Sequence, residues 1–201
     1  MKDEAIEFWF DFSSSYAYFA MFEIEAIAEK HDRSVLWRPF MLGTAFEVTG
    51  AGRLSHTPLK GDYARHDWKR IARLTGRTHI LAPHHPSVAL AATRAFYHVE
   101  RTRPEKAVPF AKAIFEAYFT QGIDTANPKD VGRVAASLGL AAEEIARADA
   151  DPEMKRHARE MSESAVARGI FGAPWFVVDG EPFWGWDRLP MLDDWLERGG
   201  W

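Results

Sequence analysis

Residues 8 to 19 read FWFDFSSSYAYF, and this segment decides the expected fold. Apolar side chains alternate with other residues from Ile6 to Phe12, which is the two-residue period of a β-strand. From Tyr16 to Ile27 the apolar residues recur at three- and four-residue spacing, which is typical of a helix. Three serines, Ser13–Ser15, lie between strand and helix, where the free N–H groups of a helix start favour negative charge. We therefore expect one of these serines to hold a bound anion or thiolate.

The composition predicts an ordinary globular protein and excludes several kinds of chemistry. The chain has 201 residues, of which 47% are hydrophobic, and its net charge is −4. A nucleic-acid partner would require a basic surface, so none is expected. The chain contains no cysteine, which excludes disulfides, thiolate metal sites and cysteine nucleophiles. The charged start, Met1-Lys2-Asp3-Glu4, is unlike a signal peptide. No apolar run approaches the ~20 residues that span a membrane. We therefore expect a cytoplasmic protein with no membrane partner.

The first sixty residues predict a strand, a helix and a second strand, followed by a loop. Residues 5–12 form the first strand, residues 14–30 the helix, and residues 34–39 a short strand that ends at a proline. This order favours a parallel pair of strands. Residues 40–59 contain three glycines and a proline and are expected to be irregular, either as a functional loop or as a plain linker.

The next hundred residues predict helices only. The expected helices span residues 61–75, 86–101, 105–121, 128–138, 141–148 and 152–168. Asn127 and Asp151 each precede a proline that can begin a helix, so both are expected to be N-caps.

The chain ends with a predicted hairpin and a helix. Strands at 175–178 and 181–184 flank Asp179-Gly180, a strong hairpin signal, and an amphipathic helix follows at 187–198. The first and last parts together have the elements of a thioredoxin fold. We therefore predict an α/β, thioredoxin-like domain made of residues 1–59 and 170–201, with an all-helical insertion at 60–169.

Four short motifs could carry function, and each has a plain structural alternative. A serine at a helix start is most often only a cap. Pro174 precedes a strand and is either trans or cis; if cis, it would present the Ala173 N–H and C=O to a peptide-like ligand. Asp187 begins a helix, as an N-cap or as part of an ion-binding site. The pair His84-His85 has no further ligand at metal spacing, so we expect a solvated helix start there and no metal site.

Three of these motifs, in this order, resemble one known family. Residues 10–14 read Phe-Asp-Phe-Ser-Ser, residues 172–174 read Gly-Ala-Pro, and residues 185–189 read Gly-Trp-Asp-Arg-Leu. They resemble 2-hydroxychromene-2-carboxylate isomerases, which are grouped with kappa-class glutathione transferases and have a DsbA-like thioredoxin fold. The likeness covers essentially the whole chain and includes Leu42-Gly43, Thr49-Gly50, Lys60-Gly61-x-Tyr63 and Gly122-Ile123-Asp124.

The resemblance implies a glutathione site. It places the catalytic serine on Ser14, where redox relatives have the first cysteine of Cys-x-x-Cys. Its hydroxyl would donate to the glutathione sulfur and, with the helix start, favour thiolate. Pro174 would be cis, and Ala173 would pair with the cysteinyl backbone. Trp186 (through its N–H) and Asp187 would hold the γ-glutamyl end, and Lys60 would lie near the glycyl carboxylate. Ser13 and Ser15 would keep a capping role.

The implied activity is glutathione-dependent isomerisation of an aromatic catabolic intermediate, in which a thiolate adds, a bond rotates and the thiolate leaves. The alternatives are a glutathione transferase acting on another electrophile and a thioredoxin-fold binding protein without turnover. The family also implies a homodimer. The aromatic residues that could line a site for a flat substrate are Trp9, Phe46, Trp68, Trp175, Trp184 and Trp186.

Three positions depart from the family pattern. Ser15 replaces a proline, Ala51 replaces an asparagine that contacts glutathione, and Trp186 replaces a small or polar residue. These differences bear on the ligand rather than on the fold.

Overall fold

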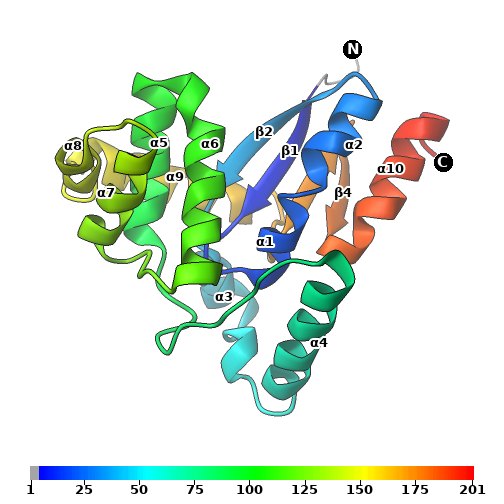
Figure 1. Ribbon diagram of the computed structural model, residues 1–201. Helices are drawn as coiled ribbons and strands as arrows, with labels where there is room; N and C mark the ends of the chain where they lie inside the picture. The colour runs from blue at the N-terminus through cyan, green and yellow to red at the C-terminus, as the bar shows by residue number, and fades with distance from the viewer. Residues whose placement is uncertain (1–4) are drawn as a thin grey trace.

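The computed structural model describes residues 5–201. Met1–Glu4, and with them the first four residues of the predicted 1–59 segment, lie outside the described residues. A mixed four-stranded sheet lies at the centre, in the order β2-β1-β3-β4 (Figure 1). β1 (Ala5–Phe10) pairs in parallel with β2 (Ser34–Pro39) and antiparallel with β3 (Trp175–Val178), and β4 (Glu181–Trp184) completes the hairpin. The predicted α/β architecture is confirmed.

β1 is a central strand and is buried on both faces. Ile6, Phe8 and Phe10 are fully buried, and Trp9, which points to the opposite face, is 1% exposed. Phe8 faces Trp37 of β2 and Phe176 of β3 in the register of the sheet. The strand ends at Phe10, two residues earlier than expected, because the main chain turns at Asp11: the Ser14 N–H donates to the Asp11 carbonyl.

The helix expected at 14–30 is two helices. α1 (Ser15–Ala20) and α2 (Ile24–Lys30) are separated by a tight turn, in which the N–H groups of Phe22 and Glu23 donate to carbonyls three residues back. The Glu23 carboxylate accepts a hydrogen bond from the Trp186 indole, 163 residues away in sequence. A tertiary contact therefore lies at the break, where the local sequence alone favours a continuous helix.

Residues 40–59 contain more helix than the irregular segment that was expected. They contain α3 (Leu42–Thr49), which ends at Gly50 with φ = 69°, and a short 3-10 helix, η1 (Leu54–His56). The Asp11 carboxylate accepts the Leu42 N–H at the start of α3, and so satisfies one of the free donors of that helix.

The helical region closely follows the prediction. Its helices are α4 (Lys60–Thr75), α5 (Leu90–Thr102), α6 (Pro104–Glu116), the π-helical turn η2 (Ala117–Gln121), α7 (Pro128–Ser137), α8 (Ala142–Arg147) and α9 (Pro152–Ala167). Asn127 and Asp151 are N-caps, as predicted, and accept from the N–H groups two residues on. The helix expected from residue 86 begins only at Leu90.

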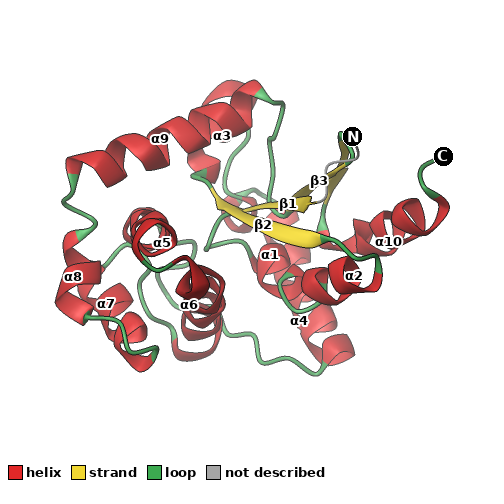
Figure 2. Cartoon of the chain, turned by 90° about the horizontal axis from the view of Figure 1, so that it is seen from above, coloured by secondary structure: helices red, strands yellow, loops and turns green. Residues whose placement is uncertain are grey.

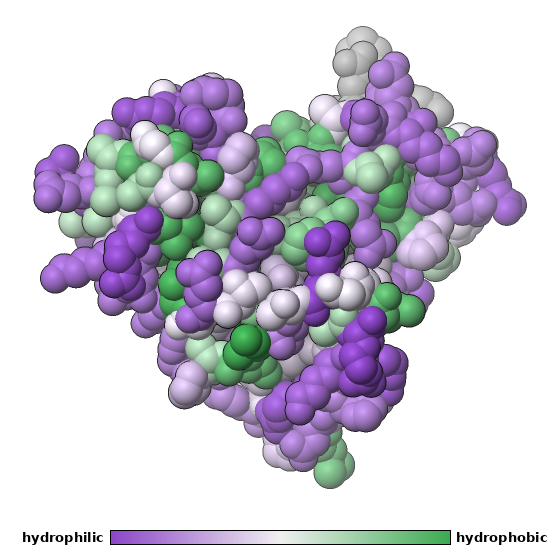
Figure 3. Space-filling view, in the orientation of Figure 1, coloured by the Kyte–Doolittle hydropathy of each residue, from purple (hydrophilic) through white to green (hydrophobic). Residues whose placement is uncertain are grey.

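The sheet has helices on both faces. Figure 2 shows α3 and α9 on one side and α1, α2, α5, α6 and α10 (Leu189–Arg198) on the other. The larger core joins the sheet to the helical region, since the Phe10 ring lies 5.3 Å from that of Phe115 and 6.2 Å from that of Phe96. A smaller core under α9 contains Trp9, Phe40, Ala165, Ile170 and Trp175. α4 buries Ala64, Trp68 and Ile71 and presents a largely hydrophilic outer surface (Figure 3).

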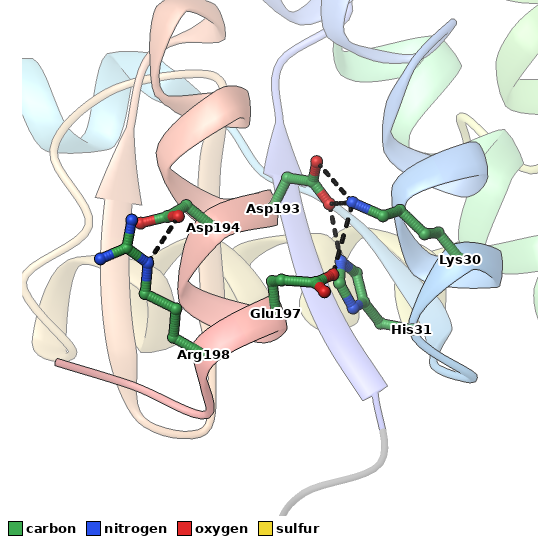
Figure 4. A network of polar contacts seen from close by, with 6 residues as sticks. All are labelled: Lys30, His31, Asp193, Asp194, Glu197 and Arg198. Atoms are coloured by element: carbon green, nitrogen blue, oxygen red, sulfur yellow. Dashed lines mark hydrogen bonds and ion pairs between the residues drawn. The ribbon is translucent and has the colours of Figure 1, made fainter.

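The hairpin and the last helix close the fold as predicted. Asp179 and Gly180 both have positive φ, at 51° and 87°, which is the conformation of a type I′ hairpin turn. A 3-10 turn, η3 (Trp186–Arg188), leads into α10. α10 is joined to the end of α2 through Asp193, whose carboxylate lies 2.9 Å from Lys30 Nζ and 2.6 Å from His31 Nε2 (Figure 4).

Candidate active site

A large cavity lies beside the end of β1 and the start of α1. Its volume is about 1120 Å³. Its walls come from α3, α4, the loop before α5, and the segments on either side of the C-terminal hairpin; they include Ser14, Lys60, Ala173, Trp186 and Asp187. Five of the six predicted site residues therefore line one cavity. The sixth, Pro174, follows Ala173 directly.

Ser14 connects the start of α1 to the segment before β3. Its backbone is extended (φ = −82°, ψ = 112°), and its Oγ accepts from the Ala17 N–H at 3.2 Å. The same hydroxyl donates to the Ala173 carbonyl at 2.9 Å. Ser14 is therefore both the N-cap of α1 and the residue that faces the Ala173–Pro174 bond.

The capping role predicted for Ser13 and Ser15 is wrong. Ser13 donates its N–H (2.8 Å) and hydroxyl (2.7 Å) to Asp11 Oδ1. Ser15 is already the first helical residue, is 2% exposed, and its hydroxyl has no partner among the described residues. An N-cap must be extended so that its side chain reaches forward to the free N–H groups, and only Ser14 meets that condition.

Asp11 is a site residue that the sequence analysis did not identify. It is 4% exposed, and its carboxylate accepts from Ser13 twice and from the Leu42 N–H at 3.0 Å. Burial raises the pKa of Asp11, although these hydrogen bonds and the positive charge of Arg53 oppose that effect. Asp11 thus fixes both the turn that carries Ser14 and the start of α3. A charged residue directly after a strand of buried aromatic residues was the available signal.

The Ala173–Pro174 peptide is cis, as the resemblance implied. The Pro174 carbonyl accepts the Gly185 N–H at 3.0 Å, so this segment is held against the one after β4. A Cβ on Gly172 would lie 2.2 Å from Trp184 Nε1, which explains a glycine at this close approach. The Ala173 carbonyl is occupied by Ser14, whereas its N–H has no hydrogen-bond partner within residues 5–201.

The residues predicted for the two ends of glutathione also lie at the cavity. The Asp187 side chain is 67% exposed, and Arg188 lies 3.4 Å away. Lys60 begins α4, and no ion pair to its ammonium is found in the described part of the chain. The Trp186 indole N–H donates to Glu23 Oε1 at 2.8 Å, which leaves the main-chain N–H of Trp186 for the predicted role.

The aromatic wall is smaller than expected. Phe46, Trp68, Trp184 and Trp186 line the cavity. Trp9 and Trp175 do not, because both point into the smaller core under α9. The predicted lining is therefore wrong at these two residues.

The expectation of a solvated helix start at His84-His85 is also wrong. His85 is half-buried in the cavity wall, and its Nδ1 lies 3.0 Å from the Tyr118 hydroxyl. Its ring is 5.7 Å from that of Trp68. Burial lowers the pKa of His85 to about 4, so the ring is neutral at pH 7. The His85-Pro86 peptide is cis, and α5 starts four residues later.

Within residues 5–201 no group of three His, Asp or Glu side chains is placed to hold a metal ion. No described helix combines the length and the apolar composition needed to cross a membrane.

The chain is similar to known proteins over nearly its whole length. The chain is 26% identical to a 2-hydroxychromene-2-carboxylate isomerase from Sphingobium xenophagum, over 96% of this chain and 98% of that protein. It is 23% identical to glutathione S-transferase kappa 2 from Caenorhabditis elegans, over 96% of this chain and 92% of the other. A solved structure of a 2-hydroxychromene-2-carboxylate isomerase superposes with a TM-score of 0.86 at 22% identity, covering 96% of this chain and 95% of that one.

The model of the DSBA-like thioredoxin domain matches residues 5–197, which is nearly the whole chain. The structure agrees with that match: it has the sheet order β2-β1-β3-β4, a helical region between the two parts of the sheet in sequence, and a cis proline that faces the start of α1. The chain therefore belongs to the DSBA-like thioredoxin family.

Proposed function

We propose that this protein is a glutathione-dependent isomerase that acts on an aromatic compound like 2-hydroxychromene-2-carboxylate. The observation that carries the proposal is Ser14, whose hydroxyl lies at a helix start, in a large cavity, 2.9 Å from the carbonyl that precedes a cis proline. One relative is named as a 2-hydroxychromene-2-carboxylate isomerase, which supports isomerisation, and another as a kappa-class glutathione transferase, which supports the use of glutathione.

The cavity residues are complementary to the charged and polar groups of glutathione. Lys60 is a cation without a counter-ion in the described chain, and it suits a carboxylate. Asp187 is an exposed carboxylate and suits an ammonium group. The free Ala173 N–H suits a peptide carbonyl in the manner of an added strand. The chain has no cysteine, so a thiol must come from a ligand.

Glutathione supplies, when bound, a thiolate that can add to a conjugated substrate and leave again. Ser14 would serve this chemistry by turning its single O–H from the Ala173 carbonyl to the sulfur, because a hydrogen bond to the charged form lowers the pKa of a thiol. The Ala17 N–H polarises the same hydroxyl from the helix side. Phe46 and Trp68 offer apolar faces to a flat substrate.

The decisive experiment is a calorimetric titration with glutathione on the native protein, Ser14→Ala and Ser14→Thr. We expect the native protein and Ser14→Thr to bind glutathione and to show ultraviolet thiolate absorbance near neutral pH. Ser14→Ala is expected to bind but to lose most of that absorbance. Absence of binding to the native protein would remove glutathione as the cofactor and leave a thioredoxin-fold binding protein without turnover.

Net conjugation is the second candidate, and the kappa-class relative favours it. The two reactions are distinguished by the product. Mass spectrometry of the product shows an unchanged mass for isomerisation and the added mass of glutathione for transfer. We expect an unchanged mass with a conjugated hydroxyaryl carboxylate. We also propose a homodimer, which light scattering of the purified protein would test.

A further inference from the structure

A second group of polar residues lies in the cavity wall, away from the start of α1. The Tyr118 hydroxyl accepts the Ser87 N–H at 2.9 Å and lies 3.0 Å from His85 Nδ1. The Ser87 hydroxyl in turn donates to Asp124. His85 and Ser87 both line the cavity, whereas Tyr118 is 1% exposed behind them.

These contacts assign the proton on the His85 ring. A backbone N–H can only donate, so the Tyr118 oxygen accepts from Ser87, and among the described residues the one acceptor found for its own O–H is His85 Nδ1. In a neutral ring the proton is then on Nε2. No described residue bonds to Nε2, so the cavity wall carries a fixed and unused N–H donor.

Arg53 provides a positive charge in the same cavity. Four cationic side chains line the cavity in the described chain: Arg53, Lys60, Arg70 and Arg188. Arg70 pairs with Asp67 and Arg188 with Asp187, whereas no ion pair is found for Arg53 or Lys60. Arg53 is exposed and lines the cavity, and its positive charge acts on Asp11 and on Tyr118, the partner of His85.

The anionic side chains of the cavity do not neutralise Arg53. Asp11 is buried and fully engaged by Ser13 and Leu42. Asp67 accepts from Tyr16 and Arg70, and Asp187, the third carboxylate that lines the cavity in the described chain, lies 3.4 Å from Arg188. An unpaired cation and an unused N–H donor in one cavity are suited to a carboxylate, which accepts charge-assisted hydrogen bonds from both.

We propose that Arg53 and His85 form the subsite that binds the carboxylate of the substrate, with Tyr118 holding the His85 ring in its donor form. This inference rests on the proposed function for the identity of the substrate. It adds where the substrate's carboxylate lies, and it assigns Arg53 to the substrate and Lys60 to glutathione.

The test needs no glutathione and uses two probes, 2-hydroxycinnamate and its neutral amide. Their dissociation constants are measured by quenching of tryptophan fluorescence, since Trp68 lies beside His85. We expect the native protein to bind the acid about tenfold more tightly than the amide, as for hydrogen bonds to a charged group. Arg53→Gln and His85→Leu should abolish this preference, and His85→Gln should keep part of it, because its amide can donate from near Nε2.

Arg70→Gln is the matched control, because it removes the same charge from the same cavity but from a cation that is already paired. It should keep the preference for the acid. An unchanged preference in both Arg53→Gln and His85→Leu would overturn the proposal. So would a loss of glutathione affinity in Arg53→Gln with unchanged probe binding, since Arg53 would then belong to the glutathione site. Failure of glutathione to bind the native protein would overturn the proposed function alone, because the probe titrations would still decide the carboxylate subsite.

Discussion

Replacing the three junction serines one at a time is expected to separate two destabilising changes, at Ser13 and Ser14, from one at Ser15 that is neutral or stabilising. Ser14→Ala removes the cap on the Ala17 N–H and the bond to the Ala173 carbonyl. Loss of the cap costs about 1 kcal/mol and loss of the second bond about 1 kcal/mol. The total of about 2 kcal/mol lowers the melting temperature of a chain of this length by roughly 4–8 °C.

The neighbouring serines behave differently. Ser13→Ala removes a hydrogen bond to the buried Asp11 carboxylate, which is worth roughly 1.5–3 kcal/mol. Ser15→Ala removes a buried hydroxyl that has no partner, so it removes a desolvation cost and loses no bond. We expect its melting temperature to equal or exceed that of the native protein.

The assay is thermal unfolding at pH 7, followed by circular dichroism, with urea unfolding of the same variants to obtain free energies. Ser14→Thr is the control, because it keeps a hydroxyl at the N-cap and should melt near the native temperature. The hydrogen bonds assigned to Ser14 and Ser15 are wrong if Ser15→Ala is as unstable as Ser14→Ala, or if Ser14→Ala melts like the native protein.

Three further perturbations test other parts of the structure. Asp11→Asn should lower the free energy of unfolding by about 1–3 kcal/mol, because an amide cannot accept all three hydrogen bonds that the carboxylate accepts. It should also displace Ser14 and so reduce the thiolate absorbance of bound glutathione. A native free energy of unfolding in urea would contradict this prediction. Gly43→Ala lies inside α3 with free space around it and should raise the free energy of unfolding by roughly 0.5–1 kcal/mol. Gly132→Ala should lower it by about 1–3 kcal/mol, because the new Cβ would lie 2.6 Å from the Ala142 carbonyl oxygen. Equal urea midpoints for the two variants would refute the packing of α7 on α8. Hydrogen bonds from Arg103 and His98 lower the pKa of Glu144 from 4.5 to about 2, so the stability that Glu144 contributes is complete above pH 4.5 and is lost as the pH falls toward 2. The loss of unfolding free energy in Glu144→Gln, relative to the native protein, should therefore become smaller between pH 4.5 and pH 2. A loss that stays constant with pH would contradict these hydrogen bonds.

The elements that the sequence predicted correctly are those whose signal is local. The Asp179-Gly180 turn and the two-residue period of β1 depend on neighbouring residues only, and both are present. α3 was missed because its start is satisfied by Asp11, 31 residues earlier, and no local pattern records that bond. The break between α1 and α2 was missed for the same reason, since Trp186 contacts Glu23 there.

The site shows the same limit. The resemblance brought Ser14 and Ala173 into one prediction although 159 residues separate them, because a family motif carries tertiary information that periodicity does not. Asp11 and His85 lay outside those motifs. Their roles depend on burial and on partners from other elements, Leu42 and Tyr118, so the sequence pattern alone could not assign them.

The size of the cavity bears on how the two ligands are arranged. Pockets that hold one drug-sized ligand have volumes of roughly 300–1,000 Å³, and this cavity, at about 1120 Å³, exceeds that range. We propose that two cations divide it, Lys60 binding glutathione and Arg53 binding the substrate. Under the proposed function both ligands would occupy the cavity together, which is required if a thiolate is to attack a bound substrate. We therefore expect saturating glutathione to change the Kd of 2-hydroxycinnamate by less than about threefold. Mutual exclusion in the same fluorescence titration would show that both ligands compete for one subsite, and the division of the cavity would then be wrong.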